Sequence, residues 1–240
     1  MGLDARLRLA RLVLRTDARE RQGDLADFLT AALAGGVDVV QVRQDGLDAD
    51  AGRAVLDVVE QVAARSQAVV GVQGPAARGG AAQADLLHLD HPDESSARAR
   101  RSLHPWALLG RTAGDADEVD AALADDELDY LFVGPVHAAS PDGSYPRRGH
   151  DLLRYAARAA PVFSMDAKPW FATGGITADT LDPALEAGAR RVCVSGAITR
   201  SDDPQGAAAR LAEPLAQAWR AEPASERYRF AAAASVGRNR

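Results

Sequence analysis

The fold is decided by residues 170–196, which read WFATGGITADTLDPALEAGARRVCVSG. Two apolar runs in this stretch, Trp170–Thr173 and Arg191–Ser195, predict buried strands. The segment between them has helical spacing from its expected N-cap, Thr177, to its stop at Gly188. A strand, a helix and a second strand in this order predict one βα unit of a parallel sheet.

The same alternation extends along the rest of the chain, where Ala-rich helical segments separate short apolar runs. Residues 24–33 form one such segment, and Gly35–Gly36 ends it. The runs expected to be strands are Leu12–Arg15, Val37–Val42, Ala68–Val72, Leu86–Leu89, Ala107–Gly110, Tyr130–Val133, Trp170–Thr173 and Arg191–Ser195. Eight such units in 240 residues predict an α/β fold, a single (β/α)8 TIM barrel, rather than an open doubly wound sheet.

The barrel is expected to occupy residues 1–220. Residues 221–240 are expected to be a flexible C-terminal extension, with a helix that docks on a partner subunit as the alternative. The single cysteine, Cys193, lies in an apolar strand, which favours a buried core residue over a reactive thiol.

Charge and composition limit the partners. Lys and Arg number 28 against 34 Asp and Glu, a net charge of -6 that argues against nucleic acid. No apolar stretch approaches the length of a membrane span, and the N-terminus lacks a signal-peptide pattern, so a cytoplasmic location is expected. The expected partners are small phosphorylated substrates, and the chain could form a homo-oligomer.

Two neighbouring strand ends carry the residues of an anion site. Gly174 and Gly175 follow the seventh strand, and Ser195 and Gly196 follow the eighth. Glycines leave backbone N–H groups open to an anion, and the loops after strands seven and eight commonly bind phosphate in this fold. The sequence therefore predicts a phosphate site here, with a plain tight turn as the alternative.

The second strand ends in Gln41-Val42-Arg43, and alternation places Gln41 and Arg43 on one side, toward the barrel interior or its mouth. A guanidinium there suits a phosphate or a pyrophosphate. The alternative is a structural ion pair with a neighbouring strand.

Several stretches together resemble the thiamine-phosphate synthase family, especially its actinobacterial members. They keep the family's order over about residues 8–218, and they are Ala10–Arg19, Ala31–Arg43, Ala84–Leu89, Leu109–Thr112, Asp129–Val136, Lys168–Ile176, Ala187–Arg191 and Ala197–Thr199.

The resemblance implies a transferase of thiamine biosynthesis that joins a pyrimidine pyrophosphate to a thiazole phosphate, with Mg²⁺ on the pyrophosphate. It implies that the thiazole phosphate binds at Gly174, Gly175, Ser195 and Gly196, and that the pyrimidine pyrophosphate lies near Gln41, Arg43 and Gln73. Thr112 stands where the family has a serine at its catalytic centre. Asp93 stands where the family has one of two metal-binding aspartates.

The chain also departs from the family's pattern. Asp45 replaces a lysine, Gln73–Gly74 replaces an Asn-Asp pair with the other metal carboxylate, and Asp90–His91 replaces Gly-Gln. Ala139–Asp142 replaces a Thr-x-Thr-Lys run. The two lysine-to-aspartate changes shift the local charge by about four units toward negative, which disfavours a polyanion.

Arg147 and Arg148 lie in the same loop as Asp142 and could restore part of that charge. The departures leave two alternatives to the transferase. One is a thiazole phosphate tautomerase or isomerase with His137 as proton carrier, although His137 does not stand at that branch's motif position. The other is a non-catalytic protein that binds a phosphorylated ligand.

Two further patterns favour structural roles. His88 lies inside an apolar strand and is expected to be a hydrogen-bonded core or mouth residue, and with His91 and Asp93 it makes only a weak zinc motif. The acidic run 115–129 is expected to be the solvated face of a helix.

Overall fold

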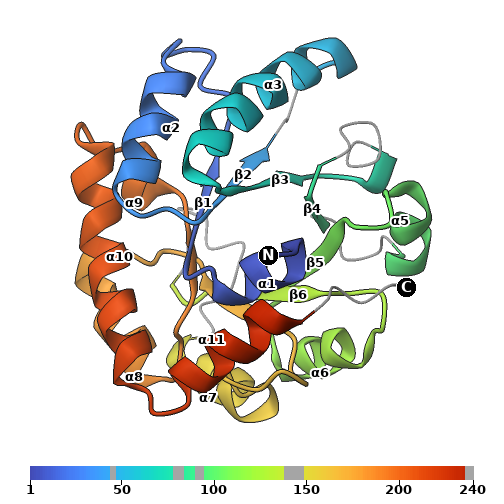
Figure 1. The fold of residues 1–240 in the computed structure, drawn as a ribbon, viewed down its shortest axis with the longest axis vertical. Helices are drawn as coiled ribbons and strands as arrows, with labels where there is room; N and C mark the ends of the chain where they lie inside the picture. The colour runs from blue at the N-terminus through green and yellow to red at the C-terminus, as the bar shows by residue number, and fades with distance from the viewer. Residues whose placement is uncertain (44–46, 78–83, 90–94, 138–148, 236–240) are drawn as a thin grey trace.

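The computed structural model describes residues 1–43, 47–77, 84–89, 95–137 and 149–235. Eight parallel strands close into one barrel in chain order, and helices surround it (Figure 1). The strands are β1 Leu12–Thr16, β2 Val39–Arg43, β3 Val69–Gln73, β4 Leu86–Leu89, β5 Leu108–Ala113, β6 Tyr130–Val133, β7 Trp170–Thr173 and β8 Val192–Val194. The predicted closed barrel is confirmed, because β8 pairs with β1 as well as with β7.

Three strands have the predicted bounds, and the others differ at their ends for local reasons. β2 begins at Val39 because Asp38 turns the chain: its carboxylate accepts the backbone N–H groups of Arg11 (2.8 Å) and Leu12 (3.0 Å). β5 continues beyond Gly110 to Ala113, because its pairing with β6 extends through Thr112 and Ala113.

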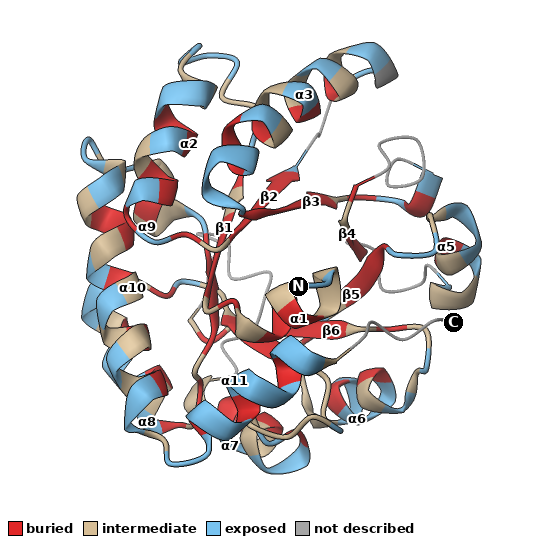
Figure 2. Ribbon diagram, viewed as in Figure 1, coloured by how far each residue is buried: buried red, intermediate tan, exposed pale blue. Residues whose placement is uncertain are grey.

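Most of the helices cover the outside of the barrel. They are α1 Leu3–Leu9, α2 Leu25–Ala34, α3 Ala49–Ser66, α5 Ser96–Ser102, α6 Ala116–Ala124, α7 Gly149–Ala159, the 3-10 helix Ala178–Thr180, α8 Leu181–Glu186, α9 Gly196–Thr199, α10 Pro204–Ala221 and α11 Ser225–Ala234. The predicted N-cap at Thr177 is confirmed. Strands are buried and outward helix faces exposed (Figure 2), so the core lies inside the barrel and beneath its helices. None of the described helices is long and apolar enough to span a bilayer.

The barrel interior is filled from alternating strand positions. Val13, Tyr130, Phe132, Phe171 and Cys193 belong to one buried inner cluster, so the prediction that Cys193 is a core residue is confirmed. Its burial also raises the pKa of its thiol. Gly110 makes room for the Tyr130 ring, into which a Cβ at this position would project.

The N-terminal end of the barrel is closed by α1 and α11, which pack together (Figure 1). Tyr228 of α11 is buried, and its hydroxyl accepts a hydrogen bond from Arg191 Nη2 (3.2 Å). The Arg191 guanidinium also lies over the Trp219 ring at 4.9 Å, and burial lowers its pKa to about 10. Residues 225–234 are thus a packed helix, which differs from the flexible extension expected over 221–240. The difference arises because Tyr228 gives this helix a buried anchor.

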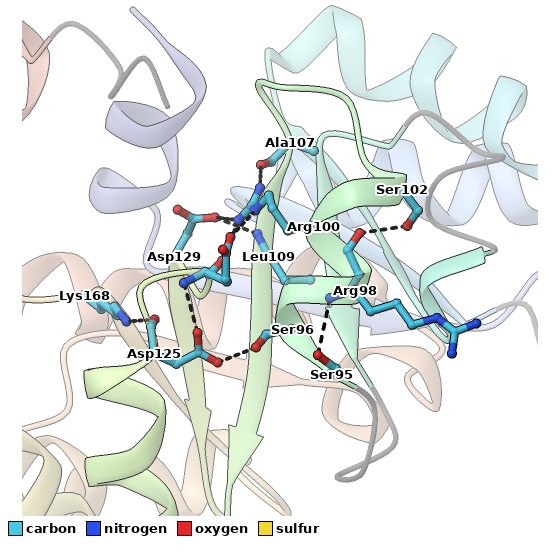
Figure 3. A network of polar contacts seen from close by, with 12 residues as sticks. Ser95, Ser96, Arg98, Arg100, Ser102, Ala107, Leu109, Asp125, Asp129 and Lys168 are labelled. Carbon is cyan, nitrogen blue, oxygen red and sulfur yellow. Dashed lines mark hydrogen bonds and ion pairs between the residues drawn. The ribbon is translucent and has the colours of Figure 1, made fainter.

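The acidic run 115–129 is only partly the face of a helix. Helix α6 ends at Ala124, and Asp125 and Asp129 lie in a polar network beyond it (Figure 3). The Asp129 carboxylate accepts from Leu109 N (2.8 Å) and pairs with Arg100 (2.5 Å). Lys168, the chain's only lysine, donates to the carbonyl oxygens of Ala122 and Asp125. Asp129 therefore has a structural role that its sequence context did not reveal.

Candidate functional site

A cleft of about 980 Å³ lies at the C-terminal ends of the strands. Its walls come from the ends of β1, β2, β7 and β8 and from the loops that follow them. This is the end of the barrel where the βα loops converge and where catalytic residues lie in this fold. Another cavity, of about 710 Å³, lies near the N-terminal ends of β2 and β3 beside α1, and none of the predicted site residues lines it.

The four predicted phosphate-binding residues, Gly174, Gly175, Ser195 and Gly196, all line this cleft. Gly174 (φ +94°) and Gly175 (φ +73°) have left-handed backbone conformations that favour glycine. A Cβ on Gly174 would collide with Pro135, and a Cβ on Gly175 would lie 2.8 Å from His137 Cβ. Both glycines thus let the loops after β6 and β7 pack closely.

That close packing leaves donors available for a ligand. The carbonyl oxygens of Thr173 and Gly174 accept the backbone N–H groups of Val136 and His137, both at 2.9 Å. Within the described ranges, no acceptor takes the backbone N–H of Gly174 or Gly175. Two adjacent unsatisfied N–H groups on a cleft wall suit a phosphoryl oxygen.

The charge of the cleft is opposite to that of the whole chain. Its described lining includes five arginines and two acidic residues, in a chain of net charge -6. The arginines are Arg15, Arg19, Arg21, Arg43 and Arg200, and the acids are Asp17 and Glu20. A concentration of guanidinium groups in a concave site favours an anionic ligand.

Arg19, one of these arginines, has a structural role. Arg19 pairs with Asp24 (2.6 Å) and donates to Thr199 O (3.2 Å), so it ties the loop after β1 to α9. Hydrogen bonding to Asp24 raises the pKa of Arg19, and the same contact lowers the pKa of the Asp24 carboxyl.

Gln41 and Arg43, predicted to face the interior or the mouth, lie in different surroundings. Arg43 is exposed and lines the cleft. Gln41 is buried, and its Oε1 accepts from Arg15 Nε at 3.1 Å. The hydroxyl of the neighbouring Tyr130 donates to Leu87 O at 3.3 Å. Gln41 thus belongs to a polar network inside the barrel, below the open cleft.

Gln73 and Gly74 end β3 beside Arg43, which is the register partner of Gln73. Oε1 of Gln73 is buried and has no hydrogen-bond partner among the described residues. Gly74 has φ +153°, a conformation that L side chains rarely adopt. The chain's glycine therefore suits its backbone at the position where the family has an aspartate.

Thr112 forms a pair with His88. The threonine hydroxyl lies 2.9 Å from His88 Nε2, and the His88 ring stacks on Phe132 with 4.2 Å between centroids. His88 is fully buried, and burial followed by the charges of Arg15 and Arg111 lowers its pKa well below the usual value. His88 is therefore the expected hydrogen-bonded interior residue, and it holds the predicted catalytic residue Thr112.

The neutral state of His88 predicts an effect of pH on stability. Its imidazole binds a proton in the unfolded chain below about pH 6.5, but in the folded chain only at much lower pH. The unfolded state thus takes up more protons, and the free energy of unfolding should fall by up to about 1.4 kcal/mol per pH unit below that point. We expect urea unfolding of His88→Asn to show a shallower decline between pH 6.5 and 5 than the wild type.

Thr112→Val is the matched control for this measurement, because it removes the hydrogen bond to His88 but leaves the buried imidazole in place. Its decline with pH should stay close to that of the wild type. Equal slopes for His88→Asn and the wild type would show that His88 does not cause the decline.

His137 lies against the glycine loop. It is half-buried, its backbone N–H donates to Gly174 O, and its ring meets the His150 ring edge-on with 5.6 Å between centroids. The structure therefore brings His137 beside the predicted phosphate site. Asp93, Asp45, Asp142, Arg147 and Arg148 lie outside the described residues.

Comparison with known proteins shows which family the chain belongs to. A family model described as "Thiamine monophosphate synthase" matches residues 12–198. The chain belongs to this family. It is 44% identical to a thiamine-phosphate synthase of Thermobifida fusca over 216 residues, which cover 90% of this chain and 97% of that relative. A Mycobacterium marinum protein of the same description is 43% identical over 222 residues, or 89% of this chain and 98% of that one.

A solved structure supports the fold of this thiamine monophosphate synthase family member. A thiamine phosphate pyrophosphorylase from Pyrococcus furiosus superposes with a TM-score of 0.75 at 20% identity, covering 89% of this chain and 98% of that chain. The matched residues 12–198 contain every predicted site residue. No sequence pattern indicated that Gln41 would hydrogen-bond to Arg15 inside the barrel. The sequence pattern marks Arg15 only as the end of a strand. Arg15 stands two residues after Val13, a member of the inner cluster, so its side chain points to the same interior side.

Proposed function

We propose that this family member is a thiamine-phosphate synthase, a transferase that joins a pyrimidine pyrophosphate to a thiazole phosphate. The observation that carries the proposal is the cleft at the C-terminal end of the barrel, where several arginines lie near glycine N–H groups that have no acceptor among the described residues. The similarity to thiamine-phosphate synthases over about nine-tenths of the chain supports the same reaction.

The thiazole phosphate binds at Gly174, Gly175, Ser195 and Gly196 in this proposal. Backbone N–H groups there donate to its phosphoryl oxygens without a side chain between them. The guanidinium of Arg200 packs against Gly196, where it adds positive charge to the same end of the cleft.

The pyrimidine pyrophosphate lies toward β2 and β3, with Arg43 and Gln73 beside it and Gln41 beneath it. In the reaction, the C–O bond to pyrophosphate breaks with its electron pair leaving on the pyrophosphate oxygen. The thiazole nitrogen then donates its electron pair to the pyrimidine methylene carbon and forms the new C–N bond. Positive charge in the cleft stabilises the departing pyrophosphate.

Thr112 and His137 are proposed to contact the reacting groups, from β5 and from the loop after β6. Neither is among the described residues that line the cleft. Thr112 is oriented by its hydrogen bond to His88, and His137 is held by its backbone bond to Gly174. Hydroxyl and imidazole groups can both donate hydrogen bonds to an anionic leaving group.

The proposal includes Mg²⁺ on the pyrophosphate, as the family resemblance implies. The described residues contain no group of three or more His, Cys, Asp or Glu side chains that could hold a metal. The buried Oε1 of Gln73, which has no hydrogen-bond partner in the described part of the chain, fits a cation that prefers oxygen ligands. Gln73 and Asp93 would hold the ion with the diphosphate, and the ion would neutralise charge on the departing pyrophosphate.

An assay with both substrates and Mg²⁺ tests the proposal. We expect product formation that stops when EDTA removes the metal, because the diphosphate needs charge neutralisation to depart. Consumption of both substrates in equal amounts as the product forms supports the synthase. No product at high enzyme concentration rejects it.

If no product forms, two further measurements distinguish the two alternative functions. A tautomerase or isomerase would convert the thiazole phosphate alone, and His137→Ala would remove turnover while calorimetry still showed binding. A non-catalytic protein would bind the thiazole phosphate without converting it.

A further inference from the structure

The barrel interior contains a guanidinium whose bonding is incomplete. Arg15 belongs to β1 and lines the floor of the cleft. Its Nε donates to Gln41 Oε1 at 3.1 Å, and its Cζ lies 5.2 Å from the centre of the Phe132 ring. Its Nη2 is buried and has no hydrogen-bond partner among the described residues.

The partners of Arg15 provide no compensating charge. Gln41 is a neutral amide and Phe132 an aromatic ring, and none of the ion pairs found in the described part of the chain includes Arg15. A buried guanidinium N–H without an acceptor is unfavourable, and the half-buried Arg15 also lacks an anionic partner among the described residues. An anionic ligand would remove both costs.

The register of the barrel places Arg15 between the two halves of the proposed site. On one side it pairs with Gln41 of β2, two residues before Arg43. On the other side Leu14 pairs with Val194 of β8, one residue before Ser195. Arg15 therefore stands at the level where the glycine loops and the arginine of β2 face each other.

We infer that Arg15 is an anion-binding residue of the cleft floor, which contacts a phosphoryl oxygen of the bound substrate while Gln41 holds its guanidinium in place. This inference deepens the proposed function and rests on it for the identity of the substrate. Gln41 is a positioning residue here, because its side chain is buried and its Oε1 accepts from Arg15 Nε within the barrel.

Isothermal calorimetry with inorganic pyrophosphate and inorganic phosphate tests the inference without turnover. Arg15→Met keeps much of the apolar stem over Phe132 but removes the donors. We expect it to weaken binding of at least one of the two ions by about 30-fold, the usual effect of losing charge-assisted hydrogen bonds. Arg15→Lys retains the charge without the planar fork and should fall between Met and the wild type.

Arg98→Met is the matched control, because Arg98 is exposed on α5 and does not line the cleft. It should bind both ions as the wild type does. If Arg15→Met does not fold, Arg15→Lys decides the matter through the same titration. Wild-type affinity for both ions in a folded Arg15 variant, or no measurable binding of either ion to the wild type, overturns the inference.

Kinetics with the two substrates identify which phosphoryl group Arg15 contacts. A raised KM for the pyrimidine pyrophosphate assigns it to the diphosphate, and a raised KM for the thiazole phosphate assigns it to the monophosphate. Gln41→Met should raise the same KM by a smaller factor and leave the other KM unchanged, whereas a purely structural role would affect both. Loss of ion binding in Arg15→Met without any wild-type turnover would keep this inference and reject the synthase.

Discussion

Gly174→Ala should lower kcat/KM for the thiazole phosphate by about 100-fold, the scale seen when backbone donors to an anion are displaced. At φ +94° an alanine is strained, and its Cβ would collide with Pro135 in the loop after β6. Strain and overpacking together should cost about 2–4 kcal/mol of unfolding free energy, which leaves most domains folded. Calorimetry with thiazole phosphate and steady-state kinetics measure the effect on the site.

Gly188→Ala is the matched control for that substitution. Gly188 also has a left-handed conformation (φ +99°), and a Cβ there would lie 2.7 Å from Ala157 Cβ, but it does not line the cleft. It should lose a similar amount of stability and keep its affinity for the thiazole phosphate. Equal losses of affinity in the two variants would mean that the effect of Gly174→Ala is general destabilisation.

Asp45→Lys combined with Asp142→Lys should raise kcat/KM for the pyrimidine pyrophosphate by about 10- to 100-fold. The two changes reverse about four units of charge where the family resemblance places a polyanion, and one charge contact in such a site is worth roughly 2 kcal/mol or more. Both residues lie outside the described residues, so the prediction rests on their positions in the family's motifs. Steady-state kinetics at fixed ionic strength provide the measurement.

The control for the double variant is Asp126→Lys, which makes one charge reversal at an exposed position outside the cleft. It should leave the kinetics unchanged. An unaltered rate in the double variant would contradict the charge explanation of the departures. Restoring the family's aspartate with Gly74→Asp is a poorer test, because φ +153° strains any side chain there.

Most of the fold could be predicted because its signals are local. Short apolar runs, glycine stops and helix caps recur in the same order, and the βα connection leaves few arrangements for eight parallel strands. The end of β5 was less predictable, because Arg111 and Thr112 resemble loop residues and become strand only through pairing with β6. The packing of α11 depends on the contact of Tyr228 with Arg191, 37 residues away, which no local pattern specifies.

The position of the candidate site was predictable because glycines follow two neighbouring strands. Gly174, Gly175, Ser195 and Gly196 were expected to lie together from their positions after these strands, and all of them line one cleft. The roles of interior polar residues were not predictable in this way. Gln41 hydrogen-bonds to Arg15, and His88 hydrogen-bonds to Thr112. Both contacts depend on which strands are neighbours and on their register.

The most direct test of the account is a crystal structure of the protein with thiazole phosphate bound. The account predicts phosphoryl density at the backbone N–H groups of Gly174 and Gly175, beside Ser195 and Gly196. Density for the phosphoryl group at any other place, or side chains that fill this cleft in the presence of saturating ligand, would contradict it.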